Sequence, residues 1–400
     1  MSTIFRQSLA LTLSNLKSLR RRIWISLSLV FSVAMVVTVL LGFLSMSNGF
    51  RTSLQQAGSN DIAIALSKGA ATELSSRIDP SQLHYLDGTT GIAGDAAGVS
   101  VMSPEMVVPV EVQEKTGGLL STLSLRGIGP FGLSVRPNVR IARGRMFNPG
   151  ASEIVVGRRL SLDYKGLEIG EQLTFGTSKW TVVGIFDAGG SVFESEMLAD
   201  IGVVQTLFNR PNLVQSVRIK LISPEALPAL QSMAAATPQI GLTLRSEQDY
   251  FAGLAERTSK LILLLGWPLA ITMAAGAVVG AMTTMFSSVS DRSTEIATVR
   301  AIGFSRRAAF AGTWIEAMAL TCLGCLAGVG FSYLVLNGWM ASTVSPDRTQ
   351  IGFQLVLSLP LVMKAVWLSL IIGAIGGALP ALAATRIPLR LAMSGRAQAG

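Results

Sequence analysis

The chain has 400 residues, of which 50% are hydrophobic and only 14% are charged, and its mean hydropathy is +0.50. Soluble domains carry about a quarter charged residues, so this composition excludes an ordinary soluble protein and indicates a chain embedded in a bilayer. The formal net charge is +9, but the surplus lies in short segments beside apolar runs. That distribution sets membrane topology and excludes a nucleic-acid-binding face.

The chain begins with a basic segment, followed by an apolar run. Residues 1–22 hold five basic residues and no acidic residue, and Leu9, Leu13 and Leu16 share one helical face. This pattern predicts a cytoplasmic amphipathic segment on the inner leaflet. Residues 23–46 carry no charge and are long enough for a first transmembrane helix. A cleaved signal peptide is the alternative, but the run is long and no small-x-small site follows it, so we expect an uncleaved anchor.

Residues 47–260 lose the apolar pattern and predict an extracytoplasmic α+β domain with helical stalks, in two lobes. Turn residues separate short runs typical of strands, and residues 80–86 and 224–233 show helical patterns. Phe251, Leu254 and Thr258 share a face that continues into the next apolar run. The predicted strands are residues 61–66, 106–112, 153–156, 172–175, 179–186 and 216–222.

Three more apolar runs follow, so the predicted fold is α-helical in the membrane, with four transmembrane helices in a one-plus-three order around the inserted α+β domain. The basic segments belong in the cytoplasm, which places both termini there and the protein in a bacterial inner membrane. The predicted segments are transmembrane helices at 261–289, 309–340 and 361–385, a cytoplasmic elbow at 290–308, an extracytoplasmic loop at 341–360 and a cytoplasmic tail at 386–400.

Few residues offer catalytic or metal-binding chemistry. The sequence has no G-x-x-x-x-G-K motif followed by Ser or Thr, and His84 is its single histidine, which we interpret as a surface or capping residue. Cys322 and Cys325 lie together in an apolar run, where we expect packing side chains. We therefore predict no catalytic residue, cofactor or metal in this chain. Glu316 enters the third span, either as a structural partner of the elbow arginines or as a proton relay.

The elbow carries the most informative pattern. Ile296, Val299 and Gly303 share a helical face, Glu295 is spaced for pairing with Arg292, and Gly303 is placed to end the helix. Such a segment is either a charged connector that sets topology or a short helix that inserts into a groove on a cytoplasmic partner. The pattern alone favours the connector.

A family resemblance changes that preference. Residues 295–303 resemble the elbow signature of the MacB/FtsX/LolC-type ABC permeases, which is Glu-Ile-Ala, two apolar residues, a basic residue, Ala, Ile or Leu, and Gly; Thr298 departs from it. Further segments resemble the family and occur in the same order along the chain. They are the basic segment 16–22, the periplasmic-core segments 141–147, 153–157, 170–171 and 182–186, and the exit segments 377–381, 384 and 388–391. The resemblance covers essentially the whole chain.

The resemblance implies a mechanism and partners. A cytoplasmic ABC ATPase, which binds ATP and Mg, would engage the elbow, and two permease copies or homologues would move together and drive the extracytoplasmic domains. Membrane lipid and a periplasmic adaptor are further candidate partners. Because MacB carries a fused N-terminal ATPase whereas 22 residues precede the first span here, we expect a separate ATPase, as in LolC or DevC. The ATPase-coupling residues would be Glu295, Ile296, Val299, Arg300 and Gly303.

Two functions fit this resemblance. The first is export or extraction of a lipid, lipoprotein, peptide or hydrophobic compound by mechanotransmission. The second is FtsX-like signalling that activates an extracytoplasmic hydrolase without transport. A domain of roughly 200 residues favours transport, because FtsX-like domains are usually smaller. A membrane-anchored scaffold or sensor explains the topology but leaves the elbow without a role.

Overall fold

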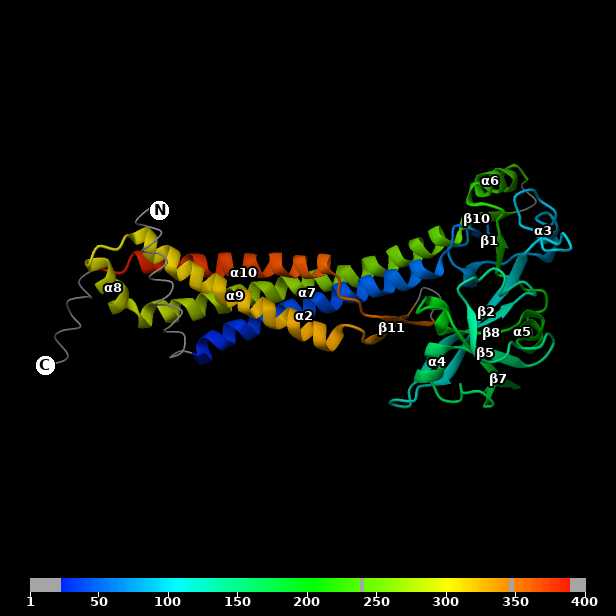
Figure 1. Cartoon of the computed structure of the whole chain (residues 1–400), viewed down its shortest axis with the longest axis horizontal. Helices are drawn as coiled ribbons and strands as arrows, with labels where there is room; N and C mark the ends of the chain where they lie inside the picture. Colours follow the sequence, from blue (N-terminus) through cyan, green and yellow to red (C-terminus); the bar gives the residue numbers. More distant parts are fainter. Residues whose placement is uncertain (1–22, 238–240, 345–348, 389–400) are drawn as a thin grey trace. The chain divides into compact units, whose positions relative to one another are not determined.

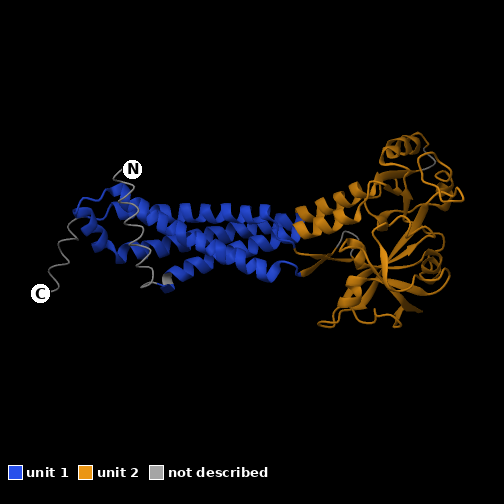
Figure 2. Ribbon diagram, viewed as in Figure 1, with its two compact units in different colours: residues 1–47, 261–339, 356–400 blue, residues 48–260, 340–355 orange. Residues whose placement is uncertain are grey.

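The structure is a computed structural model that describes residues 23–237, 241–344 and 349–388. These residues form two compact units (Figure 2). Unit 1 comprises residues 1–47, 261–339 and 356–400, and unit 2 comprises residues 48–260 and 340–355. The amphipathic segment predicted at 1–22 and most of the predicted tail lie outside the described residues.

Among the described residues, four helices are long and apolar enough to cross a membrane: α2 (Ile23–Ala57), α7 (Glu247–Asp291), α9 (Arg306–Leu336) and α10 (Leu359–Thr385) (Figure 1). The 35 residues of α2 and the 45 residues of α7 extend about 52 and 68 Å, whereas a hydrocarbon core measures about 30 Å. Both helices therefore continue past their apolar runs into unit 2, as the predicted stalks require.

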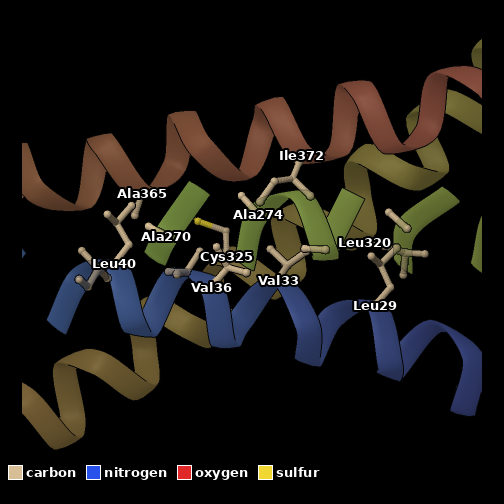
Figure 3. Packing of buried hydrophobic residues seen from close by; sticks show 14 of the residues in the cluster. Leu29, Val33, Val36, Leu40, Ala270, Ala274, Leu320, Cys325, Ala365 and Ile372 are labelled. Carbon is tan, nitrogen blue, oxygen red and sulfur yellow. The ribbon is translucent and has the colours of Figure 1, made fainter. Parts of the chain in front are cut away.

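Unit 1 is a helix bundle whose core is built from branched side chains facing small ones. Val33, Val36 and Leu40 of α2 gather with Ala270 and Ala274 of α7 in the buried cluster (Figure 3). Glycines allow the helix backbones to approach closely. A Cβ atom at Gly324 of α9 would lie 2.8 Å from the Val30 carbonyl oxygen of α2, and one at Gly328 would lie 2.7 Å from that of Ala34.

Unit 2 is built on a ten-stranded mixed sheet with the strand order β10-β1-β9-β2-β3-β8-β5-β7-β4, and β6 pairs with β7. Its strands are β1 (Ile62–Ser67), β2 (Met102–Gln113), β3 (Leu120–Ile128), β4 (Arg140–Gly144), β5 (Glu153–Gly157), β6 (Gln172–Phe175), β7 (Ser178–Asp187), β8 (Glu196–Asp200), β9 (Ser216–Lys220) and β10 (Leu242–Ser246). Its helices before α7 are η2 (Glu73–Ser75), α3 (Pro80–His84), α4 (Arg158–Asp163), η3 (Val192–Ser195), α5 (Ile201–Leu207), η4 (Pro224–Ala226) and α6 (Leu227–Ala236).

The two largest hydrophobic clusters of unit 2 lie on this one sheet. The larger surrounds Trp180 and contains side chains of β2, β3, β5, β7 and β8, and the smaller joins β1, β9 and β10 to α3 and α6. The six predicted strands and two predicted helices are all present. We expected two lobes, whereas the strands of this domain form one continuous sheet within one compact unit.

The segment predicted as an extracytoplasmic loop at 341–360 differs from that expectation. It forms a hairpin of β11 (Met340–Val344) and β12 (Gln350–Gln354), and residues 340–355 belong to unit 2. Phe353 is fully buried against Phe50, with ring centroids 5.5 Å apart. The Tyr164 hydroxyl donates to the Gln350 side chain at 2.9 Å, and Arg159 donates to the Gly352 carbonyl. The hairpin therefore supplies part of the core of unit 2.

Candidate coupling site

The predicted elbow folds as a short helix, α8 (Ser293–Ala301), between α7 and α9. Arg292 interrupts the helix with φ −106° and ψ 13°. At the other end, the N–H groups of Ile302, Gly303 and Phe304 donate to the last carbonyls of α8. Gly303 has a φ of +108°, which glycine adopts without steric cost. The predicted stop at Gly303 is therefore confirmed.

One side of α8 faces the helix bundle. Ala297 is fully buried, and the half-buried Ile296 and Val299 line a cavity against Gly312 and Thr313 of α9. The cavity has a volume of 20 Å³, enough for about one water molecule. Ile296 and Val299 thus pack α8 onto the bundle.

An ion pair fixes the beginning of α8 to α9. Arg292 Nη1 lies 3.2 Å from Glu316 Oε2, and both side chains are less than a tenth exposed. Arg292 Nε also lies 3.4 Å from Glu295 Oε2. The predicted pairing of Glu316 with an elbow arginine is confirmed, and so is the helix-surface pairing of Glu295.

A second polar contact fixes the end of α8 to the segment after α10. Arg300 Nη1 donates to the carbonyl oxygen of Ile387 at 2.6 Å. Because α7 ends directly before Arg292, α8 follows α7 in the chain. It also contacts α9 through Arg292 and the segment after α10 through Arg300. A displacement of α8 would reach α7, α9 and the exit of α10 together.

The opposite side of α8 is open. The Glu295 side chain is 67% exposed, Ile302 is 76% exposed, and Thr298 lies between them on the exposed side. Sequence reasoning did not single out Ile302, although its spacing of four residues from Thr298 and seven from Glu295 places it on their face. The five predicted residues therefore divide: Glu295 points outward, Ile296, Val299 and Arg300 contact the bundle, and Gly303 forms the turn.

Other candidate chemistry is sparse in the part of the chain that the structure describes. No group of three or more His, Cys, Asp or Glu residues there is placed to hold a metal ion. His84 is exposed at the end of α3, in agreement with its interpretation as a surface residue. Cys322 and Cys325 are free thiols on α9.

Two family models match the chain. The MacB-like periplasmic core domain matches residues 25–237, which is more than half of the chain, and the FtsX-like permease C-terminal domain matches residues 268–395. The chain belongs to the MacB/FtsX family of ABC transporter permeases. The second match contains all of α8, so the candidate coupling site of this permease lies within the FtsX-like domain.

Curated relatives agree with the family. The permease is 24% identical to the macrolide export ATP-binding/permease protein MacB of Bdellovibrio bacteriovorus, over 88% of this chain and 56% of that protein. It is 23% identical to the macrolide export ATP-binding/permease protein MacB 2 of Aeromonas hydrophila, over 96% and 60%. The ABC transporter permease YknZ of Bacillus subtilis is 30% identical over 35% of this chain and 33% of its own. The permease thus spans less than two thirds of the length of these MacB relatives.

Solved structures also match in part. The periplasmic region of MacB from Actinobacillus actinomycetemcomitans aligns with a TM-score of 0.37 at 13% identity, over 49% of this chain and 92% of that one. The extracellular domain of YknZ from Gram-positive bacteria aligns with a TM-score of 0.34 at 15% identity, over 46% and 100%.

Proposed function

We propose that this permease couples ATP hydrolysis by a cytoplasmic ABC ATPase to the export or extraction of a lipid, lipoprotein, peptide or hydrophobic compound by mechanotransmission. In this proposal α8 and both termini are cytoplasmic and unit 2 is extracytoplasmic, in the inner membrane. ATP and Mg bind to the ATPase, and this chain is non-catalytic. Two permease copies or homologues work together, with membrane lipid and a periplasmic adaptor as further partners.

The attachment of α8 carries the proposal. A short helix that leads out of α7 and is fixed to α9 through Arg292 and to the α10 exit through Arg300 is suited to receive force. Its outward face offers a carboxylate at Glu295 and an apolar side chain at Ile302 to a partner. The inward residues Ile296 and Val299 then shape the joint, and Glu295 contacts the ATPase. The export function named for the relatives favours transport over signalling.

The test places a charge on the outward face. Ile302→Asp should greatly reduce ATPase binding, because a charge placed in an apolar contact is costly, while the fold stays intact. The affinity-tagged full chain is purified from native membranes, and co-purified ABC ATPase and ATP hydrolysis are measured. Ile222→Asp is the matched control, since Ile222 is similarly exposed at 70% but lies in unit 2.

Each outcome decides between the functions. ATPase recovery and activity at wild-type level with Ile302→Asp would contradict the role of α8. Activation of an extracytoplasmic hydrolase without movement of any lipid or hydrophobic compound in reconstituted vesicles would replace transport by FtsX-like signalling. A reporter fusion that locates residue 300 outside the cytoplasm would remove the proposal altogether.

A further inference from the structure

Seven charged side chains form a buried cluster inside unit 2. Its members, called the ion cluster below, are Glu73 of η2, Glu105 of β2, Arg126 of β3, Arg136 after β3, Glu196 of β8, Arg218 of β9 and Glu247 at the start of α7. Each side chain is at most 12% exposed. Such a group is retained at a buried site only when its charges compensate one another.

The carboxylates are not equally compensated. Both nitrogens of the Arg136 fork lie 2.7 Å from the Glu105 oxygens, and Arg126 and Arg218 approach Glu105 to 3.0 and 3.3 Å. Arg126 also lies 2.7 Å from both Glu73 and Glu196. Glu247 Oε1 is 3.1 Å from Arg218 Nε, yet this oxygen accepts no hydrogen bond from any residue that the structure describes. Glu247 is the least compensated member.

The cluster holds one acid more than it has bases. Three arginines stay protonated in proteins, so four ionised carboxylates would leave one negative charge buried. A single bound proton makes the cluster neutral. The first turn of a helix attracts a carboxylate, but that attraction is much smaller than the cost of an uncompensated buried charge. The proton therefore belongs on the acid with the fewest cations around it.

The pKa values agree with this assignment. Burial raises the pKa of Glu247 to about 7, against the opposing charges of Arg218 and Arg136 and with repulsion from Glu105. Burial alone would raise the pKa of Glu105 as well, but Arg136, Arg218 and Arg126 hold that pKa at about 2. Glu247 lies in unit 2, before the apolar run of α7 begins at residue 261.

The other elements around Glu247 bring few further charges. The segment after α2 presents the backbone N–H of Ser59 to the carboxyl group. Arg245 on β10 and Asp249 on α7 are the neighbouring charged residues in sequence, and both are exposed. A cavity of 50 Å³, lined by Glu73, Arg126 and Glu196 among others, has room for a few water molecules. Glu196, which lines this cavity, is 12% exposed, so the ion cluster is not sealed from solvent.

Glu247 lies where the two long helices join the sheet. A Cβ atom on Gly58, just after α2, would lie 2.7 Å from Gln248 Cα of α7. One turn beyond Glu247, Phe251 packs edge-on against Phe193 at 5.8 Å. The Phe193 ring in turn contacts the guanidinium groups of Arg136 and Arg218 at 5.3 and 5.2 Å. The ion cluster is therefore continuous with the packing of the first turns of α7.

We propose that Glu247 is the residue that positions the first turn of α7 on the sheet of unit 2, and that it holds the turn as a neutral, protonated carboxyl group. Loss of the proton places a charge in the cluster that Arg218 does not fully compensate, and the turn loosens from β9. This inference rests on the proposed function, because α7 is the element that transmits movement there. It adds that the joint between α7 and the sheet tightens at mildly acidic pH.

The experiment measures a distance within unit 2 of the full chain in nanodiscs. Cys322→Ser and Cys325→Ala remove the native thiols, and spin labels on Lys220→Cys of β9 and Glu256→Cys of α7 use exposed positions. Pulsed electron paramagnetic resonance then records the label separation between about pH 5.5 and pH 8.5, on either side of the Glu247 pKa. We expect one narrow distribution at low pH and a broad one at high pH, half converted near pH 7.

Variants separate positioning from simple packing. Glu247→Gln mimics the protonated group, so its distribution should stay narrow at both pH values, whereas Glu247→Ala should be broad at both. Asp249→Asn, a matched change at an exposed acid two residues later, should respond to pH like the wild type. A distribution that ignores pH in the wild type, or Glu247→Gln behaving like Glu247→Ala, would overturn the proposal. If Glu247→Ala does not fold, the label distances of the wild type and of Glu247→Gln at low and high pH are sufficient to test the proposal.

The nanodisc sample contains no ATPase. The distance measurement therefore tests the contact between α7 and the sheet of unit 2 independently of transport. A normal pH response in a protein whose Ile302→Asp variant still binds its ATPase would refute the proposed function and leave the joint standing. If the label distance does not respond to pH while Ile302→Asp abolishes ATPase binding, the proposal for Glu247 is refuted and the proposed function stands.

Discussion

Gly303 forms the turn that ends the candidate coupling site, and it does so without a side chain. Its φ of +108° lies in a region that L-amino acids rarely adopt, and nothing lies within 4 Å of the position where a Cβ atom would stand. Any penalty of substitution is therefore conformational and not steric. This separation makes the residue suitable for a clean test.

Gly303→Ala should destabilise the turn after α8 by about 1 kcal/mol, the usual cost of a non-glycine residue in this conformation. ATPase coupling should fall while expression and folding persist, measured as thermal unfolding and ATP hydrolysis of the purified complex. Gly330→Ala is the control, because Gly330 also has open space around it but sits inside helix α9. Equal effects of the two changes would count against a specific role for the turn.

The Arg292–Glu316 pair is the second residue-scale feature. Removing one partner of a buried ion pair usually costs about 3–5 kcal/mol, since the other charge is left in a poor environment. Arg292→Ala and Glu316→Ala should each destabilise unit 1 strongly, and the double variant should lose much less than the sum of the two. A double-mutant cycle on thermal unfolding measures this.

The exposed pair of Glu256 and Lys260 provides the comparison for that cycle. Its atoms are closer, at 2.7 Å, but the side chains are 66% and 74% exposed, so solvent screens the attraction. We expect no measurable coupling there. Additive effects at Arg292 and Glu316 would mean that their contact does not hold α8.

At the scale of elements, close glycine contacts decide how the helices of unit 1 approach one another. Gly328 of α9 lies against Ala34 and Val37 of α2, where a Cβ atom would come within 2.7–2.9 Å of three atoms. The backbone carbonyl of Gly328 also accepts from Thr38 at 3.4 Å. A larger side chain would force the two helices apart.

Gly328→Leu should therefore destabilise unit 1 by roughly 1–3 kcal/mol or more, the usual range for overpacking. Gly330→Leu, two residues later on the open side of the same helix, should be tolerated. Thermal unfolding of both variants in the same detergent distinguishes them. A milder effect at Gly328 than at Gly330 would contradict the observed packing of α9 on α2.

The elements with a strong local pattern were predictable from the sequence. Uncharged runs predicted the long helices, and β5 or β7, with consecutive branched residues, stood out as strands. Four strands of the ten-stranded sheet were missed, namely β3, β4, β8 and β10, and each carries charged residues that local patterns assign to the surface. Arg126 in β3 and Glu196 in β8 are tolerated in the sheet because they pair with each other at 2.7 Å. Such long-range compensation is not visible in a local window.

The same limit applies to the candidate coupling site at α8. The turn at Gly303 and the pairing of Glu316 follow from local rules for helix ends and buried charge. The orientation of α8 does not, because Ile296 in the helix and Ile302 directly after it are both isoleucines. Only the position of α9 makes the first half-buried and leaves the second 76% exposed.

At the scale of the whole molecule, the ion cluster should make unit 2 sensitive to acid. The pKa of Glu105 is held at about 2, below its usual 4.5, so the unfolded chain takes up a proton more readily than the folded one. The stabilisation, on the order of 3 kcal/mol, is complete above pH 4.5 and is lost as the pH falls through about 2. Glu247 titrates in the opposite sense, but below pH 4.5 it is protonated in both states.

The melting temperature of unit 2 should therefore fall as the pH is lowered from about 4.5 to about 2. Fluorescence can follow this, because Trp180 is the single tryptophan of unit 2 and is fully buried. The Trp180→Phe variant, measured in parallel, identifies the part of the signal that comes from unit 2. A melting temperature independent of pH in this range would show that Glu105 is not held ionised.

Because of the β11–β12 hairpin, unit 2 is built from two separate segments of the sequence, residues 48–260 and 340–355. Residues 48–260 alone would lack the ring of Phe353 beside Phe50, the Gln350 acceptor of Tyr164 and the carbonyl that receives Arg159. A soluble fragment ending at residue 260 would thus expose an apolar face that the intact chain conceals. Because the hairpin lies between α9 and α10 in the sequence, the chain passes between the two units four times, after residues 47, 260, 339 and 355. Cutting the chain at any one of these points would therefore leave three covalent connections to the domain.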